Sequence, residues 1–216
     1  MHHALFEMDF ISHFFELIIT WIVILFVPGQ DMALILRTTV SSSAAQAMKM
    51  VGGICLALAV HILIATSSLG ILIVNSTLIT SGVQKLGALY LGYLGTSFII
   101  SAMRKRLPVL DLTGQPNAIL SGYQAARVGF ISTILNPKVL VFFFSLFAGF
   151  VRKDTPSVFL LAYAIGILSS TYIFYAILTK IISSEKALQF LKQNIAKTEI
   201  LSGIILVLIA LRLLVA

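Results

Sequence analysis

The chain has 216 residues, of which 59% are hydrophobic and only 11% are charged, and its formal net charge is +7. A soluble domain of this length could not bury so much apolar surface, so the composition indicates an integral membrane protein. The basic residues lie at the ends of apolar runs rather than on a polar face, which argues against a nucleic-acid partner. The single cysteine, Cys55, excludes an internal disulfide and any motif built on a cysteine pair.

Six apolar runs are long enough to cross a membrane as helices, which takes about 20 residues. In chain order they cover residues 14–40, 45–74, 82–103, 123–150, 157–179 and 200–216. The connections are too short for a soluble domain, so residues 1–216 are predicted to form one all-α polytopic membrane bundle. The more polar segment 184–197 is expected to lie along the membrane surface, in contact with anionic lipid, before the last run begins.

Two of these runs, the first and the fourth, are interrupted near the middle by a proline among polar residues. The interruptions read Pro28-Gly29-Gln30-Asp31 and Asn136-Pro137-Lys138. Proline removes a backbone donor and its ring clashes with the preceding turn, so each helix is expected to kink or unwind there. Freed backbone groups are tolerated at membrane depth only inside protein or beside a watery cavity. Paired interruptions of this kind point to the substrate site of a secondary transporter.

The spacing of the interruptions predicts an inverted internal repeat. Three spans separate the two breaks, and an odd number makes the second half enter the membrane from the opposite face. The expected repeats cover residues 14–103 and 123–216. The alternative interpretation is two unrelated proline kinks in one bundle.

Basic residues predict the orientation of the bundle. They are concentrated in the first, third and fifth connections, which lie on one side of the membrane: Arg37, Lys49, Arg104, Lys105, Arg106, Arg127, Lys180, Lys186, Lys192 and Lys197. The positive-inside rule places these connections in the cytoplasm and both termini outside.

Asp31 and Lys138 are the charges expected to lie deepest in the bundle, each just after a break. An unpaired charge there costs at least about 2.5–3.5 kcal/mol, so both are candidates for function. One hypothesis is that Asp31 alternates between a proton and a substrate amine, while Lys138 and exposed backbone N–H groups hold a substrate carboxylate. Asn136 would add a neutral hydrogen bond. The alternative is that Asp31 only caps its half-helix.

A stripe of small residues in the second run carries a histidine. Gly53, Ala57, His61 and Ala65 recur every four residues, which permits close approach of another helix and turns His61 toward protein. His61 is either a functional group or a side chain satisfied by a neighbouring carbonyl, and the sequence favours neither. Similar small-residue stripes would also serve a homodimer. A weaker polar stripe, containing Tyr172, Tyr175 and Thr179, is a possible lining of the path.

At these residues the chain resembles the LysE/RhtB-type amino-acid exporters of bacteria. The resemblance rests on four motifs in order: Pro28-Gly29-Gln30-Asp31-Met32-Ala33 with Leu36-Arg37, Gly52-Gly53-Ile54, residues 85–95, and Asn136-Pro137-Lys138 ahead of Phe142-Phe143-Phe144. It implies proton-driven efflux of amino acids or close derivatives across the inner membrane, with no cofactor. Gln30 replaces the family's usual second proline, and Ala148-Gly149 stands where the family commonly has proline and glutamine.

Two other functions are alternatives to export of amino acids. A divalent metal-ion exporter would need several convergent carboxylates, histidines or thiolates, and the spans offer chiefly Asp31, His61 and Cys55. An enzyme would need a catalytic motif, but no HExxH, Gly-x-Ser-x-Gly or phosphate-binding glycine loop is present. The sequence therefore predicts a transporter rather than an enzyme.

Overall fold

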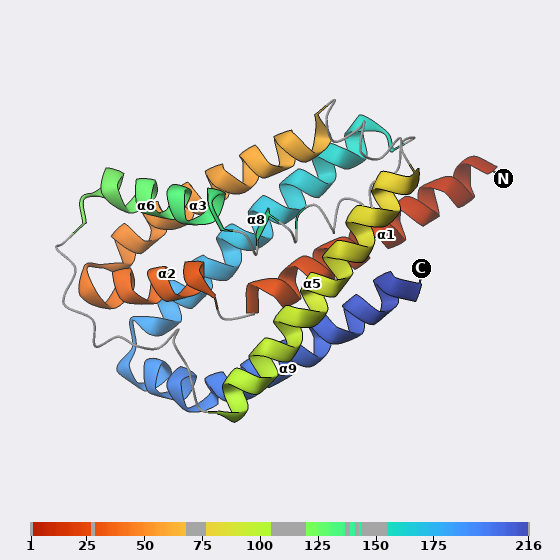
Figure 1. Cartoon of the computed structure of the whole chain (residues 1–216). Coiled ribbons are helices and arrows are strands. Elements are labelled where there is room, and N and C mark those ends of the chain that lie inside the picture. The colour runs from red at the N-terminus through yellow and green to blue at the C-terminus, as the bar shows by residue number, and fades with distance from the viewer. Residues whose placement is uncertain are drawn as a thin grey trace.

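The computed structural model describes residues 2–26, 29–67, 77–104, 120–136, 139–140, 143 and 155–215. Its elements are all helices: α1 (His2–Phe26), α2 (Gln30–Ser41), α3 (Ala44–Thr66), α5 (Thr77–Met103), α6 (Gly122–Ile134), α8 (Ser157–Ile182) and α9 (Glu185–Val215). Figure 1 shows them as an elongated bundle. The predicted all-α class is confirmed.

Four helical segments in the described part of the chain are long and apolar enough to cross a membrane: Ala44–Thr66, Lys85–Met103, Ser157–Ile182 and Gln193–Arg212. The pair α1 and α2, whose axes differ by 55°, makes a fifth if it is counted as one broken span. The predicted fourth run, 123–150, lies partly outside the described residues. The chain is thus a multi-pass membrane protein, while six spans and an inverted repeat remain predictions.

Both termini lie at the same end of the bundle in Figure 1, and the α2–α3 and α8–α9 connections lie at the other. The end of α5 and the start of α6 also lie at that second end. Among the residues that predict the orientation, Arg37, Lys49, Arg127 and Lys180 belong to helices whose ends meet there.

The helix pairs α3–α6 and α5–α9 pack through glycines on both helices. In α3, a Cβ atom on Gly53 would overlap the backbone carbonyl of Ala126 in α6, and one on Gly129 would overlap Met50. Between α5 and α9, a Cβ on Gly95 would lie 2.6 Å from the carbonyl oxygen of Gly203. The close approach predicted for the stripe on residues 53–65 is therefore present at Gly53, and α6 is its partner.

The end of the chain departs from the sequence-based expectation. Residues 185–215 form one uninterrupted helix, α9, so segment 184–197 is not separated from the last run. Ile195, Ser202, Leu206 and Ala210 are all buried and recur at helical spacing. Because this buried stripe continues across the expected boundary, packing extends the helix through the polar residues that suggested a surface segment.

Candidate functional site

The interruption between α1 and α2 creates a helix N-terminus inside the bundle. Helix α1 ends at Phe26 and α2 begins at Gln30, with extended Gly29 as its N-cap residue and no side-chain cap. Ala33 N donates to Gly29 O over 2.9 Å, which closes the first turn. Asp31 lies in that first turn rather than at the cap position. The partial positive charge of the helix end favours a carboxylate there.

The carboxylate of Asp31 is bound from another helix, α6. Ser132 Oγ and Thr133 Oγ1 each donate to Asp31 Oδ1 over 3.2 Å. Both hydroxyl residues are buried and belong to the last turn of α6, just before the second predicted interruption at Asn136. Hydrogen bonds to a charged group are worth about 1.5–3 kcal/mol each, so this pair stabilises the charged form of the half-buried carboxylate.

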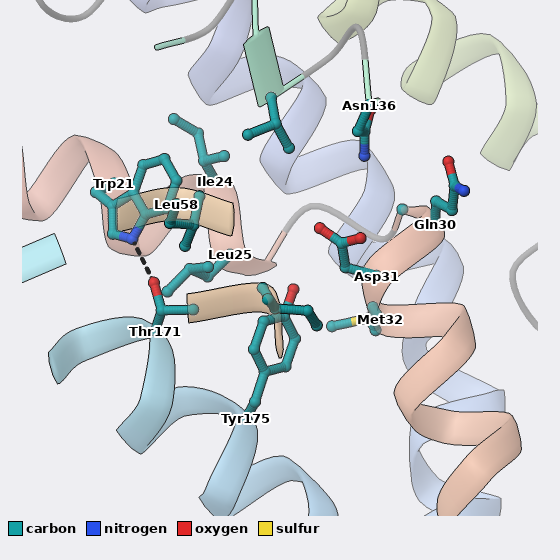
Figure 2. A pocket seen from close by; sticks show the side chains of 13 residues that line it. Trp21, Ile24, Leu25, Gln30, Asp31, Met32, Leu58, Asn136, Thr171 and Tyr175 are labelled. Carbon is teal, nitrogen blue, oxygen red and sulfur yellow. Dashed lines mark hydrogen bonds between the residues drawn. The ribbon is translucent and has the colours of Figure 1, made fainter. Parts of the chain in front are cut away.

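Asp31 faces a small cavity of about 40 Å³. Its polar lining comes from Gly29, Gln30, Asp31, Asn136, Thr171 and Tyr175, and its apolar lining from Trp21, Ile24, Leu25, Met32, Ile54, Leu58 and Val139. Figure 2 shows the carboxylate of Asp31 between Asn136 and Tyr175, with the apolar group on the far side. This volume holds a few water molecules, so a larger occupant requires the helices to move.

The far wall of the cavity is tied to α8 by a buried hydrogen bond. Trp21 Nε1 donates to Thr171 Oγ1 over 2.9 Å (Figure 2), and Thr171 Oγ1 donates to Ile167 O over 2.7 Å. Trp21 also packs edge-on against Phe143, with ring centroids 5.5 Å apart. The indole is therefore held in one orientation beside the cavity.

Only some of the predicted site residues line the cavity. Gly29, Asp31 and Asn136 meet at the cavity, and Gln30 lines its exposed rim. Asn136 is only 7% exposed. Three more of the predicted residues, Pro28, Pro137 and Lys138, lie outside the described residues. The two predicted interruptions thus meet at Asp31 and the end of α6, although they are about a hundred residues apart in the chain.

His61 is buried but does not line the cavity. Its Nε2 lies 3.4 Å from the carbonyl oxygen of Thr133, a long hydrogen bond, and its ring centroid lies 5.8 Å from that of Phe143. This contact agrees with the interpretation of a histidine satisfied by a carbonyl. His61 and Asp31 also share a neighbour, because the carbonyl of Thr133 contacts His61 and the hydroxyl of Thr133 donates to Asp31.

Sequence reasoning did not single out four of the residues that build this site. They are Trp21, Ser132, Thr133 and Thr171. One signal was available: Ser132 and Thr133 precede Asn136 by about one helical turn, so they lie on its side of the helix. Tyr175 was identified as part of a polar stripe, and it does line the cavity, whereas Tyr172 is 49% exposed.

The described residues contain no group of three histidine, cysteine, aspartate or glutamate side chains that could hold a metal ion. Cys55 instead points at α8, where its Sγ lies 3.9 Å from the carbonyl oxygen of Leu168. The geometry therefore gives no support to the alternative of metal-ion export.

Comparison with known proteins adds to this geometry. The family described as LysE type translocator matches residues 22–216. A leucine efflux protein of Klebsiella pneumoniae is 27% identical over 161 residues, which cover 72% of this chain and 73% of the relative. An uncharacterized membrane protein of Pseudomonas aeruginosa is 26% identical over 174 residues, or 78% and 80% of the two chains. A leucine efflux protein of Salmonella typhimurium is 25% identical over 162 residues, or 73% and 74%. No solved structure matches the chain.

Proposed function

The chain belongs to the LysE-type translocators, and on that premise we propose that it is a secondary-active exporter of amino acids across the bacterial inner membrane, coupled to protons by alternating access. One observation carries the proposal. The carboxylate of Asp31 lies at a helix N-terminus inside the bundle, held by two hydroxyl donors and facing a cavity with an apolar wall. Such a site offers complementary groups to a zwitterion with an apolar side chain.

The proposed binding mode assigns each end of the substrate to a different group. The substrate amine pairs with the carboxylate of Asp31, which keeps its two hydroxyl contacts. The substrate carboxylate takes backbone N–H groups at the start of α2, with the predicted help of Lys138. Asn136 hydrogen-bonds either end. We expect Lys138→Ala to raise the apparent substrate constant more than it lowers protein abundance.

The apolar wall supports a preference for aliphatic side chains. Ile24, Leu25 and Leu58 face the polar group across the cavity in Figure 2. An aliphatic side chain packed there gains about 25 cal/mol for each Å² removed from water. Two relatives carry the name leucine efflux protein, so leucine is the substrate to test first.

Coupling follows from competition for one carboxylate. When the site opens outward, a proton from outside neutralises Asp31, and the substrate amine loses its partner and leaves. When it opens inward, the proton departs to the cytoplasm and the carboxylate binds the next amine. Each cycle exchanges a proton for a substrate.

The test is efflux from membrane vesicles loaded with radiolabelled leucine, with and without a pH gradient. Wild type is expected to export leucine when the pH gradient is imposed. Asp31→Asn is expected to lose this export at equal membrane abundance. Glu16→Gln is the matched control, because it removes a carboxylate that is exposed and paired with Arg212 away from the cavity. Normal gradient-driven export by Asp31→Asn would refute the role of Asp31. Absence of leucine export by wild type would remove leucine as the substrate.

A further inference from the structure

A second carboxyl group, on Glu199 of α9, is buried inside the bundle and plays no part in the site described above. Its side chain is 2% exposed. Its Oε2 has no hydrogen-bond partner in the described part of the chain. Glu199 also lies within the apolar segment Gln193–Arg212, one of the helical segments able to cross a membrane. Burying an unpaired acid in this setting costs free energy, so a functional role is the first hypothesis for it.

The packing of α9 against α5 defines where this carboxyl lies. Gly92 packs on Ala210, and Gly95 and Ile99 both pack on Gly203, so the two helices run antiparallel. One further turn along this register brings Glu199 level with the end of α5, where Ala102 is buried. Glu199 therefore lies in the α5–α9 interface and continues the buried stripe of α9.

No described charged side chain on α9 or on the helices packed against it pairs with this carboxyl. Arg104 at the end of α5, Lys180 of α8 and Lys197 of α9 are exposed, and none of the three forms an ion pair with Glu199. Helix α1 carries no charged residue from position 17 to its end at Phe26. The neutral carboxylic acid is the form compatible with this environment, because an unpaired carboxylate would lose its hydration without compensation.

Asp31 has the opposite environment, since two hydroxyl groups and a helix N-terminus favour its charged form. Two acids whose surroundings favour different protonation states are suited to different roles. The site needs a carboxylate to hold an amine, whereas the carrier of a proton needs an acid that can be sealed in its neutral form.

Two cavities lie beside the turn of α9 that carries Glu199, although Glu199 itself lines neither of them. Ser202, one turn along the same stripe, lines a cavity of about 390 Å³ whose polar members include Asn194 and Lys197. Thr198 lines that cavity and also a neighbouring one of about 330 Å³, which is bounded by Met32. Met32 in turn lines the cavity of Asp31. Movement of α9 against α1 would thus reshape both cavities, which border the turn of Glu199, and would displace the Met32 wall of the site.

Resting on the proposed function, we propose that Glu199 carries a coupling proton in addition to the one exchanged at Asp31. The carboxylate takes up this proton when the protein is open to the outside and seals it in the α5–α9 interface as the protein closes. The proton is released to water at the end that carries Lys197. One more proton then moves inward for each amino acid exported.

Two measurements on the full-length protein test this role. The first is infrared spectroscopy at neutral pH in a detergent without carbonyl groups. Wild type is expected to show the carbonyl band of a protonated carboxylic acid, and Glu199→Gln to lack it. Absence of this band from wild type would overturn the proposal, whatever the protein transports.

The second measurement uses leucine in proteoliposomes. We expect Glu199→Gln to exchange leucine like wild type without a gradient, and Glu199→Asp to retain accumulation. On an imposed gradient, Glu199→Gln should accumulate about tenfold less leucine for each pH unit, since one proton fewer is coupled. Equal accumulation by wild type and Glu199→Gln, or a joint loss of exchange and accumulation, would overturn the proposal. Wild type that exchanges no leucine would count against the proposed function, and the infrared comparison would still decide on the proton of Glu199.

Discussion

Adjacent glycines in α3 provide a test of how the site is held together. A Cβ on Gly53 would overlap the backbone carbonyl of Ala126, whereas one on Gly52 has nothing within 4 Å. Both substitutions to alanine favour the helix equally, by about 0.8–1.0 kcal/mol. Only Gly53→Ala must push α6 away, which costs about 1–3 kcal/mol for an overpacked contact. We expect the two variants to differ by roughly this cost, with Gly53→Ala less stable.

The same displacement should reach the functional site. Helix α6 carries Ser132 and Thr133, whose hydroxyls bind Asp31 over 3.2 Å. Gly53→Ala is therefore expected to reduce leucine export as well as the unfolding temperature in detergent. Gly52→Ala should match wild type in export and unfold at an equal or higher temperature. If the two variants unfold at the same temperature and export equally, the α3–α6 contact does not hold the site as described.

Three further substitutions have defined outcomes. Thr133→Val removes a donor to the site's carboxylate and keeps the side chain's shape, so the apparent leucine constant should rise about tenfold or more in vesicle uptake. Trp21→Phe removes the indole donor to Thr171 and should raise the same constant by about two- to tenfold. Arg212→Ala breaks an exposed ion pair with Glu16 and should change stability by no more than about 1 kcal/mol, measured by thermal unfolding.

Each of these outcomes has a result that would contradict it. An unchanged leucine constant in Thr133→Val would show that the hydroxyl does not support binding. Thr171→Val is the partner control for Trp21→Phe, and a double variant no worse than either single one is expected for groups acting through one bond. A large loss of stability in Arg212→Ala would mean that the pair with Glu16 does more than an exposed contact normally does.

Local features of the chain predicted a membrane protein and some of the polar residues that line its site, such as Asp31 and Asn136. The length and apolarity of the runs indicated membrane helices because hydrocarbon requires internal hydrogen bonding. The polar residues around Asp31 predicted an interruption, and the structure has α1 ending at Phe26 and α2 beginning at Gln30. The boundary near residue 197 was wrong, because the buried stripe of α9 continues through it.

The sequence by itself predicted a helical membrane protein and singled out the carboxylate of Asp31, since a charge within an apolar run is costly in hydrocarbon. Tertiary structure alone decided that Ser132 and Thr133 bind this carboxylate and that the side chain of Glu199 is buried. Such contacts depend on how closely two backbones approach and on their register. Glycines at Gly53 and Gly203 permit that approach, but only the packed helices determine which side chains meet across it.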